Sequence, residues 1–487
     1  MEYEAVIGLE VHAQIHTRSK MFCSCPVVED TGDVPPNTHV CPVCLALPGA
    51  LPVVNRRAVE IGILTGLALN CTANPVNVFS RKSYFYPDLP KGYQISQYDL
   101  PLAVQGVLEI EVDGEMRRIG ITRVHLEEDT AKLYHTIEDS AETGAVSVDF
   151  NRAGVPLLEI VSEPELHSAA EVQAYATTLR DMLVYLGVNS GDMEKGVMRF
   201  EANVSVRPAG ERTLGARVEI KNLNSFRALS RSVEYEIKRQ SALLESGETV
   251  EQETVGWNDG AGCTYSQRSK EEAHDYRYFP EPDIPPLVIE PGWITQIKTL
   301  LPELPLEKRQ RLMSEYGIRR YDAELLVSRQ ATAAYFEEAV AMGRDINIEP
   351  QDIANWIAGE LLRYLNETGC PIESCLVTPE HLVSLLFLLQ KGAISSTAAK
   401  KVLSEVFKTG EVPNAVVKRL GLAQISDEAA LGEMIAQVIA ANPAQVQQYR
   451  DGKETVLGWL VGQVMRVSNG KANPQQVREL LLAALTS

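Results

Sequence analysis

The hydrophobic pattern of this chain changes its period once, and that change requires a fold built from two different halves. Up to about residue 290, apolar and polar residues alternate in short segments separated by Gly, Pro and Asn, which is typical of strands. The stretch 280–292 contains five prolines and interrupts both helix and strand. Beyond it apolar residues recur at helical spacing, as at Ile353, Ile357 and Leu361. The second half is therefore predicted to be all-helical.

Alternating segments and one helix define the first half. The segments are 5–14, 120–128, 145–151, 199–207 and 217–221. Ser168 and Glu171 form a capping-box pattern at the start of the helix, and Gly187 can end it. We predict an α+β fold, in which a mainly antiparallel sheet with helices is followed by a helical domain and a small helical tail. The predicted limits are 1–292, 293–408 and 409–487, the last boundary lying at a turn signal.

The charge balance restricts the partners of the chain. Its 65 acidic residues outnumber 46 basic ones, giving a net charge of −19, which argues against a general nucleic-acid binder. From residue 395 onward ten basic residues face eight acidic ones, so contact with a polyanion should favour the C-terminal end. We expect no membrane span, because no apolar run approaches the required length of about 20 residues. The start lacks the features of a signal peptide, so we expect a cytoplasmic protein.

Several predicted strands carry acidic side chains on one face, because alternate residues of a strand point the same way. Glu10 and His12 share a face, as do His125, Glu127 and Asp129, and as do Glu201 and Asn203. Carboxylates grouped with a single histidine suit Mg²⁺ and phosphoryl transfer. The alternative is that these faces are the solvated side of an antiparallel sheet.

Cysteine spacing gives a more specific prediction. Four cysteines form two close pairs, Cys23 with Cys25 and Cys41 with Cys44. Disulfides are not expected in a cytoplasmic chain, so this quartet predicts a structural zinc site in which four thiolates fill the coordination shell. Against it, the first pair is tighter than the usual spacing, and free cysteines often pack in cores.

Two stretches combine aromatic and charged residues, at 81–88 and 275–283. Lys82 can attract a phosphate or a developing anion, and the aromatic rings can shape a pocket. Equally, these stretches can be loops that pack on the sheet through their rings. The familiar nucleotide-binding and hydrolase motifs are absent, including the Walker and Gly-rich dinucleotide patterns.

The chain resembles the B subunit of the heterotrimeric tRNA-dependent amidotransferase GatCAB along its whole length. The resemblance is carried by strings that also hold the candidate residues: GLEVH at 8–12, PGALPVVN at 48–55, the stretch around Lys82 and Tyr84, YQISQ at 93–97, HLEED at 125–129, VDFNRAGVPLLEIVSEP at 148–164, KNLNSF at 221–226 and DYRYFPEPD at 275–283.

This resemblance implies a reaction and its partners. ATP phosphorylates the side-chain carboxylate of misacylated Glu-tRNA(Gln) or Asp-tRNA(Asn), and ammonia then displaces phosphate to form Gln-tRNA(Gln) or Asn-tRNA(Asn). In the family an amidase-type glutaminase, the A subunit, supplies the ammonia through a tunnel, and a small C subunit fastens the two. The first domain would hold Mg²⁺, ATP and the aminoacyl end, and the tail would contact tRNA.

The resemblance also assigns roles to residues. It places the Mg²⁺ ligands at Glu10, His12, Glu127 and Glu159, and tunnel or gate positions at Glu128 and Lys82 with Tyr84 nearby. On an ideal strand Glu128 faces away from Glu127, which fits a neighbouring role better than shared ligation.

Beyond the resemblance, we predict that Asn151, Arg152 and Arg199 bind phosphate or the aminoacyl end through charge-assisted hydrogen bonds. Two other functions stay open at this point, a free-standing ATP-dependent carboxylate–amine ligase and a non-catalytic tRNA-binding scaffold. Stimulation of ATP turnover by tRNA separates the first from the amidotransferase, and loss of activity in Glu10→Ala or His12→Ala argues against the second.

Overall fold

The computed structural model describes residues 2–28, 34–134, 146–269, 276–424, 428–468 and 470–486. It divides into two compact units, Met1–Leu304 and Pro305–Ser487, which are taken in turn. Two residues of predicted segments, Ala145 and Asp275, lie outside the described residues. The division of the chain into functional domains at 292 and 408 stays a prediction.

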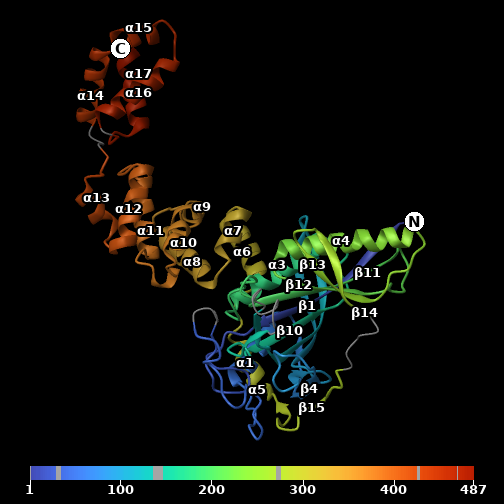
Figure 1. The fold of residues 1–487 in the computed structure, drawn as a ribbon. Coiled ribbons are helices and arrows are strands. Elements are labelled where there is room, and N and C mark those ends of the chain that lie inside the picture. The colour runs from blue at the N-terminus through green and yellow to red at the C-terminus, as the bar shows by residue number, and fades with distance from the viewer. Residues whose placement is uncertain are drawn as a thin grey trace. The chain divides into compact units, whose positions relative to one another are not determined.

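A nine-stranded sheet dominates the described part of the first unit (Figure 1). Neighbouring strands are antiparallel except for β12 and β13, so the predicted mainly antiparallel α+β fold is confirmed. The strands, in their order across the sheet, are β14 (Cys263–Ser269), β13 (Glu253–Asn258), β12 (Val218–Leu223), β11 (Met198–Pro208), β1 (Tyr3–Gln14), β10 (Pro156–Ser162), β7 (Glu115–Glu128), β6 (Ala103–Val112) and β2 (Thr72–Ala73).

The register of β1 decides which polar residues meet. β1 lies between β10 and β11, so His12 is opposite Glu159 on one side, and Glu10 is opposite Glu201 on the other. β7 pairs with the far edge of β10 and sets His125 opposite Glu159. Directly opposed residues point to the same face, and the sheet therefore gathers these side chains on one surface.

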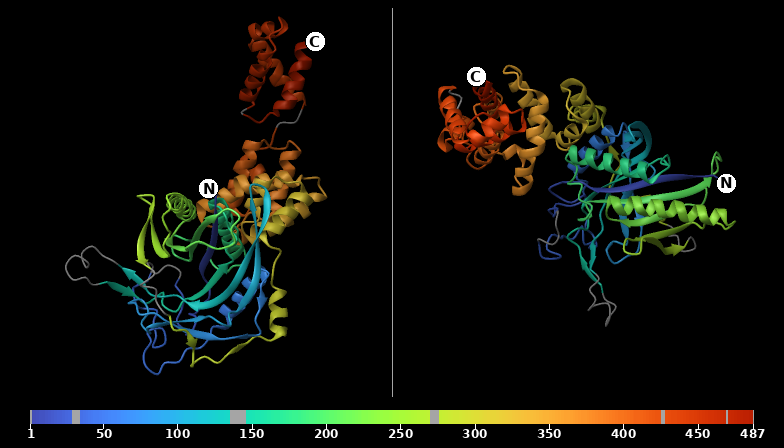
Figure 2. Two further views of the ribbon diagram at one scale, coloured as in Figure 1. Left: turned by 90° about the vertical axis from the view of Figure 1, so that its right-hand side faces the viewer. Right: turned by 90° about the horizontal axis from the view of Figure 1, so that it is seen from above.

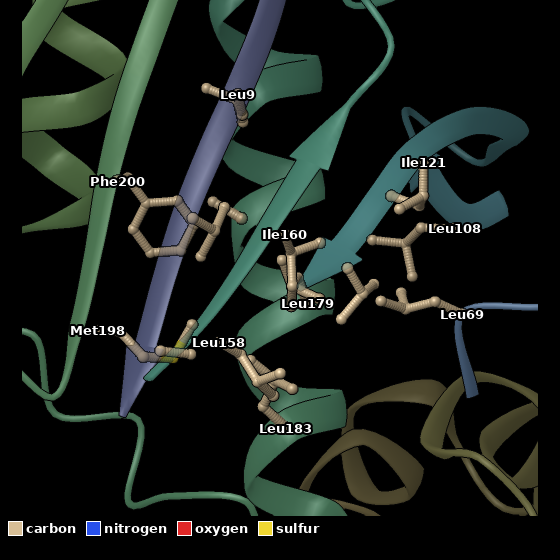
Figure 3. Packing of buried hydrophobic residues seen from close by; sticks show 14 of the residues in the cluster. Leu9, Leu69, Leu108, Ile121, Leu158, Ile160, Leu179, Leu183, Met198 and Phe200 are labelled. Carbon is tan, nitrogen blue, oxygen red and sulfur yellow. The ribbon is translucent and has the colours of Figure 1, made fainter. Parts of the chain in front are cut away.

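The other face of the sheet is apolar and is covered by helices. α3 (Ala169–Tyr185) and α4 (Phe226–Glu245) pack side by side there (Figure 1, Figure 2). Leu9, Leu158 and Phe200 from three strands belong to the same core as Leu179 of α3, and all of them are buried (Figure 3). Burying such side chains is worth roughly 1.5–3 kcal/mol each, which fixes the sheet in one orientation. The polar face is thereby directed away from the core.

The predicted ends of α3 are confirmed. The Ser168 hydroxyl accepts a hydrogen bond from the Glu171 amide at 3.2 Å, and Gly187 has the positive φ of +69° that follows many helix ends. The Glu171 carboxylate accepts a 2.6 Å hydrogen bond from the His167 amide, one residue before the position a capping box would use.

Shorter elements complete the first unit. β15 (Phe279–Pro280), β4 (Phe79–Ser83) and β5 (Tyr93–Gln97) form a small sheet, and β5 contacts β7. The remaining strands are β3 (Val76–Asn77) with β16 (Leu287–Val288), and β8 (Lys132–Tyr134) with β9 (Ser147–Asp149). Two further helices, α1 (Arg56–Ala68) and α5 (Pro291–Lys298), contact each other. Hydrogen bonds between β5 and β7 matter below because they hold the end of β7.

The second unit is all-helical over its described residues, as predicted. One apolar core involves the helices up to α13, where Val416 and Val417 are buried, and another begins at Leu431. The elements are α6 (Pro305–Tyr316), α7 (Arg320–Leu326), α8 (Gln330–Arg344), α9 (Pro350–Trp356), a π-helical turn η2 (Ile357–Leu361), α10 (Leu362–Thr368), a 3₁₀ turn η3 (Ile372–Ser374), α11 (Pro379–Gln390), α12 (Ser396–Thr409), α13 (Pro413–Leu420), α14 (Glu428–Ala441), α15 (Pro443–Arg450), α16 (Thr455–Val467) and α17 (Pro474–Thr486). Among the described residues, no helix is both long and apolar enough to cross a membrane.

Candidate active site

A cavity of about 630 Å³ lies over the polar face of the large sheet. Its floor comes from strands that are distant in sequence, with Glu10 and His12 on β1, His125 on β7 and Glu159 on β10. Its wall is aromatic and comes from the segments around the small sheet. The cavity thus combines acidic, basic and aromatic groups that the sequence carries in separate motifs.

His12, Glu127 and Glu159 meet on the polar face of the sheet, where His12 and Glu159 line the cavity and Glu127 is buried beside them. The His12 Nε2 atom lies 3.4 Å from Glu159 Oε2 and 3.6 Å from Glu127 Oε1. His125 approaches the same carboxylates, with its Nε2 atom 3.2 Å from Glu159 Oε2. Ser96 of β5 donates a 3.3 Å hydrogen bond to Glu127. Two buried carboxylates therefore converge on two imidazoles.

Glu10 belongs to a neighbouring cluster. Its carboxylate groups with those of Glu201 and Glu219, and Asn203 donates a 2.9 Å hydrogen bond to it. Lys221 lies 2.9 Å from Glu201 and 3.2 Å from Glu219. Three of the four predicted Mg²⁺ ligands, Glu10, His12 and Glu159, line the cavity, and Glu127 is buried beside them. The compact set of donor atoms consists of His12, Glu127 and Glu159.

The charges of the floor compensate one another. Burial opposes a charge on His12, but the hydrogen bond and charge of Glu159, with Glu127 and Glu201 nearby, raise the pKa of His12 to about 9. Burial also opposes a charge on Glu159, yet His125 and His12 hold its pKa well below the usual range. Burial and the carboxylates of Glu159 and Glu201 raise the pKa of Glu10. His12 is accordingly an imidazolium at neutral pH when no cation binds.

The donor atoms of His12, Glu127 and Glu159 fit a divalent cation. All three lie within 4.8 Å of one another, and two of them are carboxylate oxygens. Oxygen-rich sets of this kind, with room left for water and phosphate, suit Mg²⁺. The cavity supplies that room, so the residues present match the metal that the sequence predicts.

Lys82 and Tyr84 line this same cavity. The Lys82 Nζ atom lies 4.9 Å from the centre of the Tyr276 ring. Burial opposes its charge, but Glu127, Tyr278 and Glu159 raise the pKa of Lys82, which keeps it cationic beside the acidic floor. A half-buried ammonium in this position can attract the phosphates of a nucleotide.

Glu128 lies in a different cavity, of about 230 Å³, as its position on β7 predicts. Its carboxylate forms an ion pair with Lys91 and accepts a 3.0 Å hydrogen bond from the Ile95 amide of β5. Cys23 and Cys44 line the same cavity. The predicted gate residues Glu128 and Lys82 thus border two different cavities.

Arg152, Arg199 and Asn151 have partners within the protein. Arg199 donates a 3.0 Å hydrogen bond to Asp129, a buried residue that follows β7. Arg152 lies 3.8 Å from the same carboxylate and donates hydrogen bonds to the carbonyls of Thr130 and Ala131. None of the three predicted residues lines the larger cavity, and their binding of phosphate stays a prediction.

Asn151 instead holds a loop of the first unit. Its side chain accepts a 2.8 Å hydrogen bond from the His39 amide and donates a 2.9 Å hydrogen bond to the Pro35 carbonyl. Its own amide donates to Asp149 at 3.0 Å. These contacts are structural, and Cys41 of the predicted zinc quartet follows His39 by two residues.

The four predicted zinc ligands come together. The sulfur atoms of Cys23, Cys25, Cys41 and Cys44 lie within 4.8 Å of one another, with Cys41 and Cys44 3.9 Å apart. Sulfur atoms around a tetrahedral zinc are about 3.8 Å apart. The hydrogen bond from Cys23 lowers the pKa of Cys44 to about 4. The donor set therefore fits Zn²⁺.

A buried lysine supports this cluster and was not predicted. Lys20 is 0% exposed, and its Nζ atom lies 3.7 Å from the Cys44 sulfur and 3.2 Å from the Phe150 carbonyl. Nor was a role predicted for Lys91, Lys221 or Tyr98. Lys221 and Glu219 are two residues apart on β12 and therefore share a face, so the alternation of a strand could have predicted that they lie together. The contacts of Lys91 and Tyr98 depend on which strands are neighbours, and local alternation does not indicate that.

Comparison with known proteins agrees with this geometry. Residues 5–295 match the family model of the GatB/GatE catalytic domain, and residues 334–485 match that of the GatB domain. The chain belongs to the GatB family. A GatB relative from Moorella thermoacetica, named as the B subunit of an aspartyl/glutamyl-tRNA(Asn/Gln) amidotransferase, is 54% identical over 99% of both chains. A relative of the same name from Thermodesulfovibrio yellowstonii is 52% identical over the full length of both chains.

The match to the GatB/GatE catalytic domain covers the whole floor of the larger cavity and the cysteine cluster. The match to the GatB domain starts within α8 and includes the C-terminal helices. The predicted family is therefore confirmed over both halves of the chain.

Proposed function

We propose that this chain is the component of a tRNA-dependent amidotransferase that phosphorylates and then amidates the amino acid on Glu-tRNA(Gln) or Asp-tRNA(Asn). The side-chain carboxylate attacks the γ-phosphorus of ATP, which releases ADP and leaves an acyl phosphate. Ammonia then attacks the acyl carbon and expels phosphate, which yields the amide. The observation that carries the proposal is the convergence of His12, Glu127 and Glu159 beside a large cavity, lined by His12 and Glu159, in a GatB-family chain.

The residues of the floor would share the work of phosphoryl transfer. His12, Glu127 and Glu159 would hold Mg²⁺, with Glu10 beside them, and a bound Mg²⁺ would screen phosphate charge. Lys82 would attract phosphate oxygens from the wall of the cavity. Electrostatic positioning of this kind accounts for most of the catalysis in phosphoryl transfer.

Ammonia requires a partner and a route. We infer that a glutaminase A subunit supplies it and that a small C subunit joins the complex, as the family resemblance implies. The smaller cavity, with Glu128 and Lys91 paired inside it, is the candidate end of that route. Glu128 and Glu127 are consecutive on β7 and point to opposite sides of the strand, so the proposed route would have to pass from the side of Glu128 to the side that carries the acidic floor.

Two further assignments complete the proposal. The cysteine cluster would bind a structural Zn²⁺, because four thiolates leave no open coordination position. The C-terminal helices, where basic residues slightly outnumber acidic ones, would contact the tRNA body.

The test uses the chain co-expressed with its A and C subunits and ammonium chloride as the nitrogen source. ATP hydrolysis is measured with and without Glu-tRNA(Gln), and Gln-tRNA is quantified. We expect misacylated tRNA to stimulate ATP turnover strongly. We expect His12→Ala and Glu10→Ala to abolish stimulation and product, whereas Glu109→Gln, at an exposed site on β6, should leave both unchanged.

Turnover that is indifferent to tRNA would overturn the proposal and favour a ligase acting on a free amino acid. Full activity in His12→Ala would instead indicate a scaffold whose acidic faces are only solvated. Family membership favours neither of these alternatives.

A further inference from the structure

The phosphoryl-transfer chemistry proposed above gives no role to the aromatic wall of the larger cavity. Five tyrosines line it: Tyr84, Tyr86, Tyr98, Tyr276 and Tyr278. Tyr98 and Tyr278 stack in parallel, with ring centres 4.2 Å apart and planes 7° apart. Tyr84 and Tyr86 form a second stack at 5.8 Å. The wall is therefore a set of ordered ring faces beside an acidic floor.

Backbone pairing holds this wall in place. Tyr84 and Tyr86 follow β4, Tyr98 follows β5, and Tyr276 and Tyr278 precede β15. β4 pairs with both other strands, and its Arg81 lies opposite Phe279 of β15 and Ile95 of β5. The Ser83 amide also donates a 2.9 Å hydrogen bond to the Tyr276 carbonyl. Segments separated by nearly 200 residues are thus fixed against each other, so the rings are organised before any ligand arrives.

These rings are not core residues. Tyr98 is 51% exposed and Tyr86 is 49% exposed, although both border a large cavity. Each is the more exposed member of its stack, because Tyr278 and Tyr84 are only partly exposed. An exposed aromatic face at the mouth of a cavity is a surface on which a flat, apolar ring can stack.

We propose that Tyr98, supported by Tyr278, stacks an adenine base while the reacting end of the same molecule lies over the acidic floor. This inference rests on the proposed function, in which two substrates carry adenine: ATP, and the single-stranded 3′ end of the aminoacyl-tRNA. Single-stranded RNA ends are bound by stacking their bases on aromatic side chains. Tyr98 and Tyr278 line the same cavity as His12 and Glu159, so the wall and the floor can serve one ligand.

The experiment compares Tyr98→Ala with Tyr98→Phe in the complete complex with A and C subunits. The KM for ATP is measured at saturating Glu-tRNA(Gln), and the KM for Glu-tRNA(Gln) at saturating ATP. Loss of one stacked base predicts a rise of about 5- to 100-fold in one KM for Tyr98→Ala, with kcat little changed. Tyr98→Phe keeps the ring and should retain the wild-type KM. Tyr321→Ala, an exposed tyrosine of α7, is the matched control.

The two arms identify the source of the base. A higher KM for Glu-tRNA(Gln) alone assigns the stack to the tRNA end, and a higher KM for ATP alone assigns it to the nucleotide. Tyr98→Leu, which removes the ring but keeps an apolar side chain, provides a second variant if Tyr98→Ala does not fold.

Unchanged KM values in Tyr98→Ala, or in Tyr98→Leu where that variant replaces it, overturn the proposal. A second result also overturns it: the A subunit separates from the Tyr98→Ala chain on gel filtration while the KM values stay unchanged. That result indicates that Tyr98 contacts the A subunit instead of a base. Failure of the proposed function is distinguishable, because the wild-type complex would then show no stimulation of ATP turnover by tRNA.

Discussion

Glu159→Gln tests the electrostatics of the cavity floor most directly, because it removes one charge with little change in shape. Glu159 lies between His12 and His125, with its Oε2 atom 3.4 Å and 3.2 Å from their Nε2 atoms. Its Oε1 atom lies 3.5 Å from Arg123. The substitution therefore leaves two imidazoles and a guanidinium with less negative charge around them.

The magnitude follows from the state of His12. A rise of its pKa from 6.5 to about 9 corresponds to about 3 kcal/mol of preference for the charged ring. The largest contributions to that rise come from the hydrogen bond and the charge of Glu159. Because burial opposes the charge, we expect the pKa of His12 in Glu159→Gln to fall from about 9 toward its ordinary value of 6.5.

The assay is an NMR titration of the histidine rings in the metal-free complex, with only this chain labelled. The chain has eight histidines, so few signals need to be assigned. Glu109→Gln, on the exposed face of β6, is the control and should leave the titration of His12 unchanged. A His12 pKa that stays near 9 in Glu159→Gln would refute the reasoning.

A linked result is expected for Mg²⁺, which must displace the proton from His12. The apparent affinity of the wild type should therefore rise with pH from neutrality up to the His12 pKa of about 9 and level off above it. An affinity that does not change over this range would place the cation elsewhere.

Three other substitutions test the supporting structure. Asp129→Asn should lower the free energy of unfolding by about 2 kcal/mol at neutral pH in urea titrations, because despite its burial the charges of Arg199 and Arg152 hold the pKa of Asp129 at about 2. That contribution is present above the usual pKa of 3.8 and is lost as pH falls toward 2, so variant and wild type should converge in acid. Lys20→Met should weaken Zn²⁺ binding about 10- to 100-fold in competition with a chromophoric chelator, whereas Arg18→Met should not. Leu158→Ala should cost about 2–5 kcal/mol of stability, measured by urea unfolding of the full chain.

The alternation of residues along a strand could be predicted from the sequence, and it indicated which candidate residues of one strand lie on the same face. Glu10 and His12 share a face, and Glu127 and Glu128 point to opposite sides, with Glu128 in the smaller cavity. A strand has a side-chain period of two whatever its neighbours are, so these relations are local. Cysteine spacing was local in the same sense, because both pairs fall within one loop region.

The choice of neighbouring strands could not be predicted from such local rules. β1 pairs with strands about 150 and 200 residues away, and only this pairing sets Glu10 beside Glu201 and His12 beside Glu159. Hydrophobic alternation indicates that a strand has a buried face, but it does not indicate which strand lies beside it. The same limit explains why the pairing of Arg199 with Asp129 was not predicted. Its partner Asp129 follows β7, and both β1 and β10 lie between β7 and β11 in the sheet.

The two carboxylate clusters of the floor differ in the kind of charge that compensates them. At Glu201 and Glu219 the compensating charge is the ammonium of Lys221, which is covalently held and repels a divalent cation. At Glu127 and Glu159 part of it is a proton on His12, which can leave and expose a nitrogen donor, beside His125 and the guanidinium of Arg123. Exchange of the His12 proton for Mg²⁺ raises the charge of the second cluster by only one unit, whereas at the first cluster the full charge of Lys221 would stay beside the cation unless that side chain moved. We therefore expect His12, Glu127 and Glu159 to form the stronger cation site, with Glu10 acting from the neighbouring position on β1.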